Sequence, residues 1–335
     1  MPDPRASICP PAALTANPPK LPLFVLMMGQ PGLPDPQYVS AALDEFAARN
    51  NGLAPPIAIV ADQIGPDQND TLCLDTAKYG NVEKYINEDV VNWAKANLNI
   101  LPDREHWTIA GYSNGGQCAI SFAVKYPQMW GGNVVDISGE EFPGAEDPAG
   151  NLAAIFNGNQ AAYDAQKPIN IMKGRQFPPN TTAVFTVGSD DTTYVAAAKA
   201  VSAAARDAGM TVTYYEVPNG GHVGLALNAG LTKGFEVLYP SWACPSRPYP
   251  FPAHARAIKL RCATLARAAA ATGTVAASDE RILPLWWDRL CSVTSPPVGR
   301  PLRRRALYRR PSPPYCPVVQ PGNGRRAPGS AGDLT

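Results

Sequence analysis

Several features that would point to a particular chemistry are scarce in this chain of 335 residues. Histidine occurs only three times and the seven cysteines show no paired C-x-x-C spacing, so the sequence predicts no metal site. No stretch reaches the apolar length of a transmembrane helix. The net charge is only +1, which gives no reason to expect a nucleic acid or an anionic membrane as a partner of the whole molecule.

A recognisable targeting segment is also missing. Residues 1–19 are rich in proline and alanine, and they lack both the charged and the apolar part of a signal peptide. Taken literally, this predicts a protein that stays in the cytoplasm; alternatively, the sequence starts inside something longer. We expect residues 1–19 to be disordered.

The charge is unevenly distributed along the chain. Residues 245–335 hold 15 Arg or Lys, only four acidic residues and 14 of the 36 prolines. This composition predicts a folded domain over residues 20–244 and a largely disordered tail over residues 245–335. A basic tail could bind nucleic acid, but it has no RNA-binding motif and no interleaving of aromatic and basic residues. An aberrant extension, such as a shifted reading frame in GC-rich DNA, is favoured, and no nucleic-acid partner is predicted.

Between these two ends, short apolar runs alternate with helical patterns. The runs predict buried strands over residues 23–28, 57–60, 107–111, 134–137, 183–187 and 212–217. Apolar residues at helical spacing predict helices over residues 39–50, 82–98, 115–126, 193–208 and 222–237. This alternation predicts an α/β fold, with a mostly parallel central sheet and helices on both faces. Residues 139–180 form a long variable region that we expect to roof the site.

A G-x-S-x-G motif lies where one of these strands passes into a helix. Ser113 is its central residue, between Gly111 and Gly115. In a nucleophile elbow the serine adopts an unfavourable backbone conformation, and the flanking glycines avoid steric clashes. The same glycines match neither a dinucleotide fingerprint nor a phosphate-binding loop, so no cofactor is predicted. The motif predicts that Ser113 is a nucleophile; a purely structural turn is the alternative.

A serine hydroxyl needs a base at neutral pH, and the three histidines leave little choice. His106 has charged neighbours and is expected to be solvated, while His254 belongs to the tail. His222 follows the last predicted strand, after Gly220 and Gly221, which fits the chain order serine, acid, histidine. His222 is therefore predicted to be the general base and acid.

The remaining partners of the nucleophile are predicted from strand ends. Asp190 and Asp191 follow the strand over residues 183–187, and both compete as the acid of a triad. Asp191 is preferred because Asp190 could cap the next helix. An oxyanion hole requires two backbone N–H groups. Asn114 follows the nucleophile, and Gln30 lies in the loop after the first strand, next to Pro31, which has no N–H to give.

These motifs together resemble the putative-esterase branch of the α/β-hydrolases, which holds esterase D, feruloyl esterases and the mycobacterial mycolyltransferase antigens. The resemblance covers about residues 20–240 and is closest to actinobacterial members. It rests on residues 28–32, 103–104, 109–116, 136–139, 188–191 and 220–222. It implies the α/β-hydrolase fold, a triad of Ser113, Asp191 and His222, and oxyanion donors at Gln30 and Asn114. Members of this branch usually have His-Gly after the first strand, where this chain has Met28-Gly29. Because the oxyanion donor is a backbone N–H group, this change of side chain leaves the donor in place.

The resemblance carries two further implications. Many actinobacterial members sit outside the cytoplasm, so a location in the cell envelope is suspected although the sequence shows no membrane segment. The positions of Cys73 and Cys118 suggest a disulfide between the elbow helix and an acidic loop, and two buried thiols are the alternative. A disulfide would imply an oxidising compartment.

Three functions are compatible with these residues. The first is hydrolysis of carboxylic esters through an acyl-enzyme, acting on a small-molecule, lipid or carbohydrate ester. The second is transfer of the acyl group to a sugar or lipid alcohol. The third is a binding module that has kept a hydrolase fold without catalysis; it is disfavoured because all three triad residue types occur in the right order.

Overall fold

The computed structural model describes residues 6–14, 16–49, 56–102, 104–178, 180–222 and 224–243. The predicted tail over residues 245–335 lies outside these residues. Within them, seven strands form one sheet in the order β1-β3-β2-β6-β7-β8-β9. The strands are β1 (Ala6–Ile8), β2 (Leu23–Met27), β3 (Ile57–Ala61), β6 (Trp107–Tyr112), β7 (Asn133–Ile137), β8 (Thr182–Gly188) and β9 (Thr211–Val217).

Six of these strands are the six that the apolar runs predict, and they pair in parallel with one another. The predicted α/β fold with a mostly parallel sheet is therefore confirmed. A separate small hairpin is formed by β4 (Asp75–Thr76) and β5 (Gly80–Asn81), in the acidic loop after β3.

The seventh strand corrects one prediction. Residues 1–19 were expected to be disordered, but β1 pairs antiparallel with β3, with Ala6 opposite Val60 and Ile8 opposite Ala58. A short 3-10 helix, Pro11–Leu14, follows. The expectation is wrong for these residues because the edge of β3 presents unpaired backbone N–H and C=O groups, which a passing extended segment satisfies whatever its composition.

The helices also follow the predicted order. They are α1 (Gln37–Arg49), α2 (Val82–Lys84), α3 (Val91–Asn97), α4 (Asn114–Lys125), α5 (Pro127–Trp130), α6 (Pro148–Ala154), α7 (Gln160–Asp164), α8 (Pro168–Met172), α9 (Thr192–Asp207) and α10 (Gly224–Ala243). A π-helical stretch, Tyr85–Val90, joins α2 to α3, so that the predicted helix over residues 82–98 is continuous. A second 3-10 helix, Arg104–His106, precedes β6.

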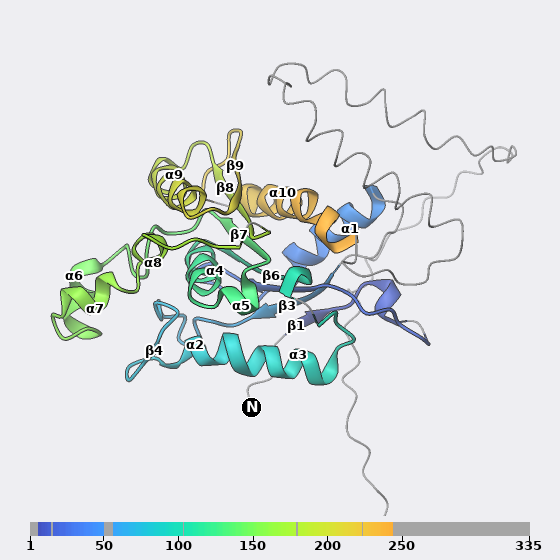
Figure 1. Cartoon of the computed structure of the whole chain (residues 1–335), viewed down its shortest axis with the longest axis horizontal. Coiled ribbons are helices and arrows are strands. Elements are labelled where there is room, and N and C mark those ends of the chain that lie inside the picture. The colour runs from blue at the N-terminus through green and yellow to red at the C-terminus, as the bar shows by residue number, and fades with distance from the viewer. Residues whose placement is uncertain are drawn as a thin grey trace, which may run out of the picture. The chain divides into compact units, whose positions relative to one another are not determined.

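The helices cover both faces of the sheet, as Figure 1 shows with α1 and α10 on one side and α3 and α4 on the other. Side chains of β2 alternate between the two faces, and all of them are buried. Leu23, Val25 and Met27 pack into the cluster that includes α3, α4 and α9. Phe24 faces α10, where its ring lies 5.1 Å from that of Phe235. Burial on both faces explains why the strands are apolar without alternation.

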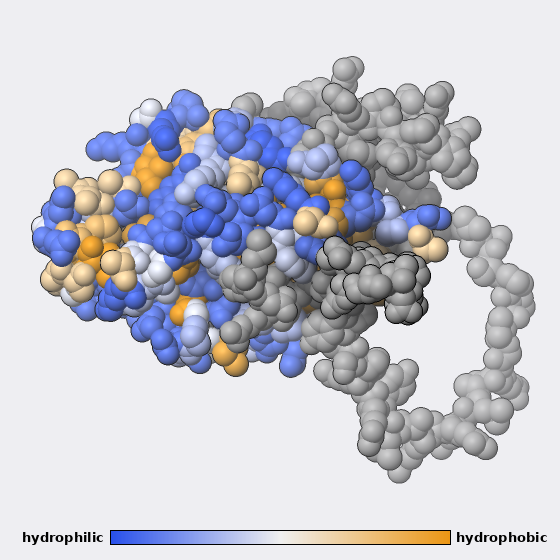
Figure 2. All heavy atoms as spheres, turned by 90° about the horizontal axis from the view of Figure 1, so that it is seen from below, coloured by the Kyte–Doolittle hydropathy of each residue, from blue (hydrophilic) through white to orange (hydrophobic). Residues whose placement is uncertain are grey.

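The variable region over residues 139–180 contains the short helices α6, α7 and α8. Tyr163 of α7 is buried there, and its ring stacks on that of Phe156 at 4.7 Å between centroids. The face in Figure 2 is largely hydrophilic, with apolar residues gathered at the end where α6 and α7 lie.

Candidate active site

The predicted site residues follow the carboxyl ends of neighbouring strands, on one side of the sheet. Gln30 follows β2, Ser113 follows β6, Asp191 follows β8 and His222 follows β9. These four strands are parallel, so their carboxyl ends meet at the same edge. This is the edge at which open α/β sheets place their ligand sites.

Ser113 occupies a sharp turn between β6 and α4. Its φ of 57° and ψ of −123° are unusual for a residue with a side chain. The turn brings Gly111 and Gly115 so close that a Cβ on Gly111 would lie 1.8 Å from the carbonyl oxygen of Gly115. A Cβ on Gly115 would lie 2.3 Å from the carbonyl oxygen of Met27. Only glycine fits at these two positions, which gives the G-x-S-x-G pattern its physical basis.

The structure brings Ser113, His222 and Asp191 together although they are far apart in the sequence. Nε2 of His222 lies 2.8 Å from Oγ of Ser113, and Nδ1 of His222 lies 2.7 Å from Oδ2 of Asp191. Ser113 is only 5% exposed, and the side chain of His222 is 30% exposed. The imidazole therefore lies within hydrogen-bond distance of both a carboxylate and a hydroxyl, at the carboxyl ends of the strands. This is the arrangement that can activate a serine.

The two aspartates that competed in the sequence have different neighbours. Oδ1 of Asp190 accepts a hydrogen bond from the hydroxyl of Ser189 at 2.9 Å. Asp191 contacts the imidazole and also occupies the N-cap position of α9, although its side chain makes no capping hydrogen bond. The idea that Asp190 caps α9 is wrong, because the helix begins one residue later than that idea requires.

The side chains of both predicted oxyanion residues hydrogen-bond to neighbouring loops. Asn114 is the first residue of α4 and is fully buried, and its side chain is held at both ends. Its Nδ2 donates to Oδ1 of Asp70 at 2.9 Å, and its Oδ1 accepts from Nε2 of Gln63 at 3.1 Å. Gln30 donates through Nε2 to the carbonyl oxygen of Gln68 at 2.9 Å. The use of their backbone N–H groups as oxyanion donors stays a prediction.

Two tyrosines that the sequence analysis did not single out stack on His222. The ring of Tyr194 lies 3.9 Å from the imidazole centroid at an interplanar angle of 26°. The ring of Tyr112 lies 5.1 Å from it at 24°. Burial raises the pKa of each phenol to about 12, so both stay neutral at physiological pH. Tyr194 could have been found from its position, because it lies one helical turn after Asp191 at the start of α9.

Buried carboxyl groups lie close to this site and were also missed. Burial raises the pKa of Glu140 to about 8, and the nearby carboxylates of Asp70 and Glu146 add to the shift. Burial raises the pKa of Asp136 to about 7, although a backbone hydrogen bond from Gly139 opposes the shift. Both residues belong to β7 or the loop after it, where the sequence signal was that of an ordinary buried strand.

His106 corrects another expectation. It was expected to be solvated, but it is only 2% exposed. Its charged neighbours, Arg104 and Glu105, share a 3-10 turn with it, and such a turn points successive side chains in different directions. His254 lies outside the described residues.

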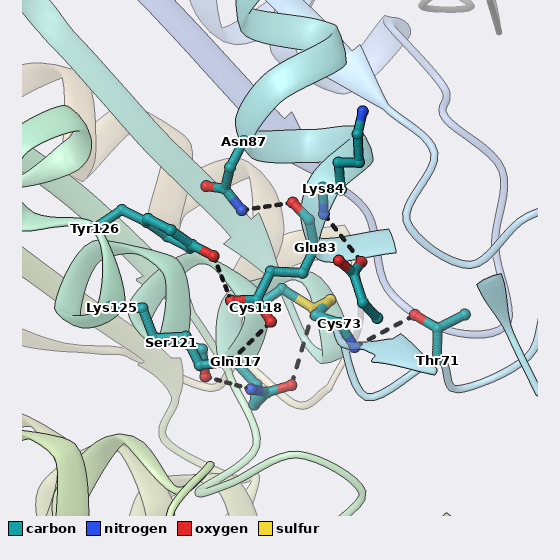
Figure 3. Close-up of polar contacts among 11 residues, drawn as sticks. Thr71, Cys73, Glu83, Lys84, Asn87, Gln117, Cys118, Ser121, Lys125 and Tyr126 are labelled. Carbon is teal, nitrogen blue, oxygen red and sulfur yellow. Dashed lines mark hydrogen bonds and ion pairs between the residues drawn. A yellow bond between two sulfur atoms is a disulfide. The ribbon is translucent and has the colours of Figure 1, made fainter. Parts of the chain in front are cut away.

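A disulfide joins Cys73 to Cys118, and their Cα atoms are 5.6 Å apart. Figure 3 shows it between the loop that carries Thr71 and the helix that carries Gln117 and Ser121. Both sulfur-bearing side chains are buried. The bridge ties the loop after β3 to the helix that begins directly after Ser113.

The described residues contain neither a metal-binding cluster nor a membrane-spanning helix. No group of three or more His, Cys, Asp or Glu there is placed to hold a metal ion. No helix in the described part of the chain is long and apolar enough to cross a membrane.

Comparison with known proteins shows a family to which the chain belongs. The family model described as "Putative esterase" matches residues 17–223. The chain belongs to this family. The resemblance seen in the sequence is thereby confirmed.

Individual proteins are also similar to this chain. An uncharacterized protein of Corynebacterium glutamicum is 30% identical over 226 residues, which cover 65% of this chain and 52% of that protein. The chain thus spans about half the length of this curated relative. A ferulic acid esterase has a similar fold, with a TM-score of 0.56 and 16% identity over 70% of this chain and 91% of the other. An S-formylglutathione hydrolase from Agrobacterium tumefaciens gives a TM-score of 0.57 and 15% identity over 70% and 88%.

Proposed function

We propose that this protein hydrolyses carboxylic esters through an acyl-enzyme, with Ser113 as nucleophile, His222 as general base and acid, and Asp191 as the carboxylate that orients the imidazole. One observation carries the proposal: the two nitrogens of His222 lie 2.8 Å from Oγ of Ser113 and 2.7 Å from Oδ2 of Asp191. These distances are within hydrogen-bond reach, as proton transfer requires.

In the proposed reaction, Nε2 of His222 takes the proton of Ser113 while Oγ attacks the ester carbonyl. The resulting oxyanion accepts hydrogen bonds from the backbone N–H groups of Asn114 and Gln30, close to the positive N-terminal end of α4. The imidazolium then gives its proton to the leaving alcohol. A water molecule, deprotonated by His222, releases the acid and restores the serine.

The substrate proposed is a small-molecule, lipid or carbohydrate ester. Two structural relatives are named for a ferulate ester and for a formyl thioester, so the fold accommodates different acyl groups. The short helices α6 to α8 follow β7 in the chain, and we propose that they shape the acyl side of the site. A series of p-nitrophenyl esters of increasing acyl length would measure its size.

The disulfide bears on the compartment in which the protein acts. Bridges such as Cys73–Cys118 persist in oxidising environments and are rare in the reducing cytoplasm. We therefore propose an extracytoplasmic site of action. Mass spectrometry of the protein taken from its native cells under non-reducing conditions tests this, and two free thiols would contradict it.

The function is tested by labelling with a fluorophosphonate probe, together with p-nitrophenyl ester hydrolysis. The unsubstituted protein should carry one label on Ser113 and turn over a short-chain ester, and Ser113→Ala should do neither. Folded protein that takes no label would favour the binding module instead. Product analysis with an added alcohol acceptor separates hydrolysis from acyl transfer.

A further inference from the structure

Gln63 makes an unusual pair of contacts beside the nucleophile. It lies two residues beyond the end of β3 and is only 2% exposed. Its single side-chain nitrogen, Nε2, donates to the carbonyl oxygen of Met28 at 2.5 Å and to Oδ1 of Asn114 at 3.1 Å. A primary amide has two N–H groups, so both donors are used.

The two acceptors belong to the two sides of the proposed oxyanion hole. Met28 is two residues before Gln30, and Asn114 is the residue after the nucleophile. Because the sheet order is β3-β2-β6, a side chain from the end of β3 must reach across the end of β2 to the residue after β6. Gln63 thus connects three neighbouring strand ends.

We propose that Gln63 is a positioning residue that fixes the distance between the two oxyanion donors, the backbone N–H groups of Gln30 and Asn114. The inference rests on the proposed function. The donors themselves come from separate loops, and the pairing of β2 with β6 ends at Met27 and Gly111, before either donor. A buried amide that binds both loops supplies that constraint.

Gln63 is itself held firmly. Its backbone carbonyl oxygen accepts a hydrogen bond from the hydroxyl of Thr71 at 2.8 Å. The same hydroxyl oxygen accepts a hydrogen bond from the backbone N–H of Cys73 at 3.3 Å. The disulfide then joins this loop to Cys118 on α4, as Figure 3 shows. Asp70, in the same loop, accepts from Nδ2 of Asn114. The loop over residues 70–73 therefore supports both Gln63 and the far side of Asn114.

Loss of the contacts of Gln63 should weaken stabilisation of the transition state more than binding of the substrate. An oxyanion forms only as the carbonyl is attacked, and its stabilisation depends on donors at the correct position. Loss of a whole donor costs about 100- to 1000-fold in kcat in such sites. Loosening the two loops should cost less, about 10- to 100-fold, with KM changed little because ground-state binding is unaffected.

The test compares Gln63→Met with Gln117→Met. Methionine has nearly the length of glutamine but cannot donate these hydrogen bonds. Gln117 is a matched control, since it is fully buried and its Nε2 donates to the hydroxyl of Ser121 at 2.7 Å, further along α4, so that this side chain does not connect the two donor loops. For each variant, kcat and KM are measured on a p-nitrophenyl ester, and the rates are divided by the fraction of protein that a fluorophosphonate titrates. A variant that folds only in part is therefore still measured.

The second readout is inhibition by an alkyl trifluoromethyl ketone, which forms a tetrahedral oxyanion on the serine. Gln63→Met should lower kcat and weaken this inhibitor by similar factors, while Gln117→Met should keep both within about threefold. Gln63→Glu, which puts a carboxylate beside two carbonyl oxygens, should lose at least as much as Gln63→Met.

The inference would be overturned if Gln63→Met lost only thermal stability and kept its kcat and inhibitor affinity. It would also be overturned if Gln117→Met lost as much activity. These outcomes differ from a failure of the proposed function, in which the unsubstituted protein would neither hydrolyse esters nor take the label.

Discussion

The ring of Tyr194 stacks on the imidazole of His222, with 3.9 Å between centroids and 26° between planes. Tyr194 and Asp191 belong to the same turn at the start of α9. This one turn therefore contacts the imidazole twice: Asp191 at the nitrogen Nδ1 and Tyr194 on the face of the ring. An aromatic face attracts a cation, so this contact should stabilise the imidazolium that forms during the proposed reaction.

Removing that ring should slow the reaction. Aromatic stacking contributes about 0.5–1.5 kcal/mol, so Tyr194→Ala should lower kcat by about tenfold. Tyr194→Phe keeps the ring and should stay within about threefold. Steady-state kinetics on a p-nitrophenyl ester measures both, and equal losses in the two variants would assign the effect to the hydroxyl instead.

The two neighbouring aspartates offer a direct test of the proposed triad. Asn in place of the acid leaves the imidazole without its carboxylate and favours the wrong tautomer, so Asp191→Asn should lower kcat by about 10⁴-fold. Asp190→Asn is the matched control, because Asp190 contacts Ser189 and should keep kcat within about threefold. A large loss in Asp190→Asn with activity retained in Asp191→Asn would refute the assignment.

The disulfide should contribute strongly to stability. Cys73 and Cys118 are separated by 45 residues, and closing a loop of this length stabilises the folded state by about 4 kcal/mol in the chain-entropy model. The free energy of unfolding of the double variant Cys73→Ala/Cys118→Ala, measured by urea titration, should therefore be lower by about that amount. Reduction of the unsubstituted protein with dithiothreitol should lower the free energy of unfolding by at least as much as the double substitution does.

Much of this structure could be predicted from the sequence, because the strands are buried on both faces and each reads as a short apolar run. The proposed nucleophile and base could be predicted for a different reason: an elbow requires glycine on both sides of Ser113, and only three histidines compete for the role of base. The choice between Asp190 and Asp191 stayed open, because neighbouring side chains in a loop can point in opposite directions and the sequence does not show which of them points toward His222. Only the three-dimensional structure brings Asp191 to the imidazole.

What the sequence could not predict depends on contacts between distant segments. The pairing of β1 is decided by the free edge of β3, and the contacts of Gln63 depend on the order of three strands. Neither leaves a local pattern. His106 was misjudged because its charged neighbours dominate the local composition, whereas burial is decided by the turn in which it lies.

Asp136 gives a prediction about pH. Burial raises its pKa from 3.8 to about 7, so the folded protein keeps this proton over a range in which the unfolded chain has already released it. Since the folded state binds more protons there, this residue makes stability fall as the pH rises from about 4 to about 7. Below that range the carboxyl is protonated in both states, and it has no effect on the pH dependence.

Replacing Asp136 by asparagine should remove this dependence. Asparagine has the same shape and still accepts a hydrogen bond from the backbone of Gly139, but it never has to be ionised in a buried place. The free energy of unfolding of Asp136→Asn, relative to that of the unsubstituted protein, should therefore increase by about 3 kcal/mol between pH 5 and pH 8. Urea titrations at both values measure the difference. If the two proteins followed parallel pH profiles, Asp136 would have to be ionised in the folded state already at pH 5, and some other group would have to compensate its charge.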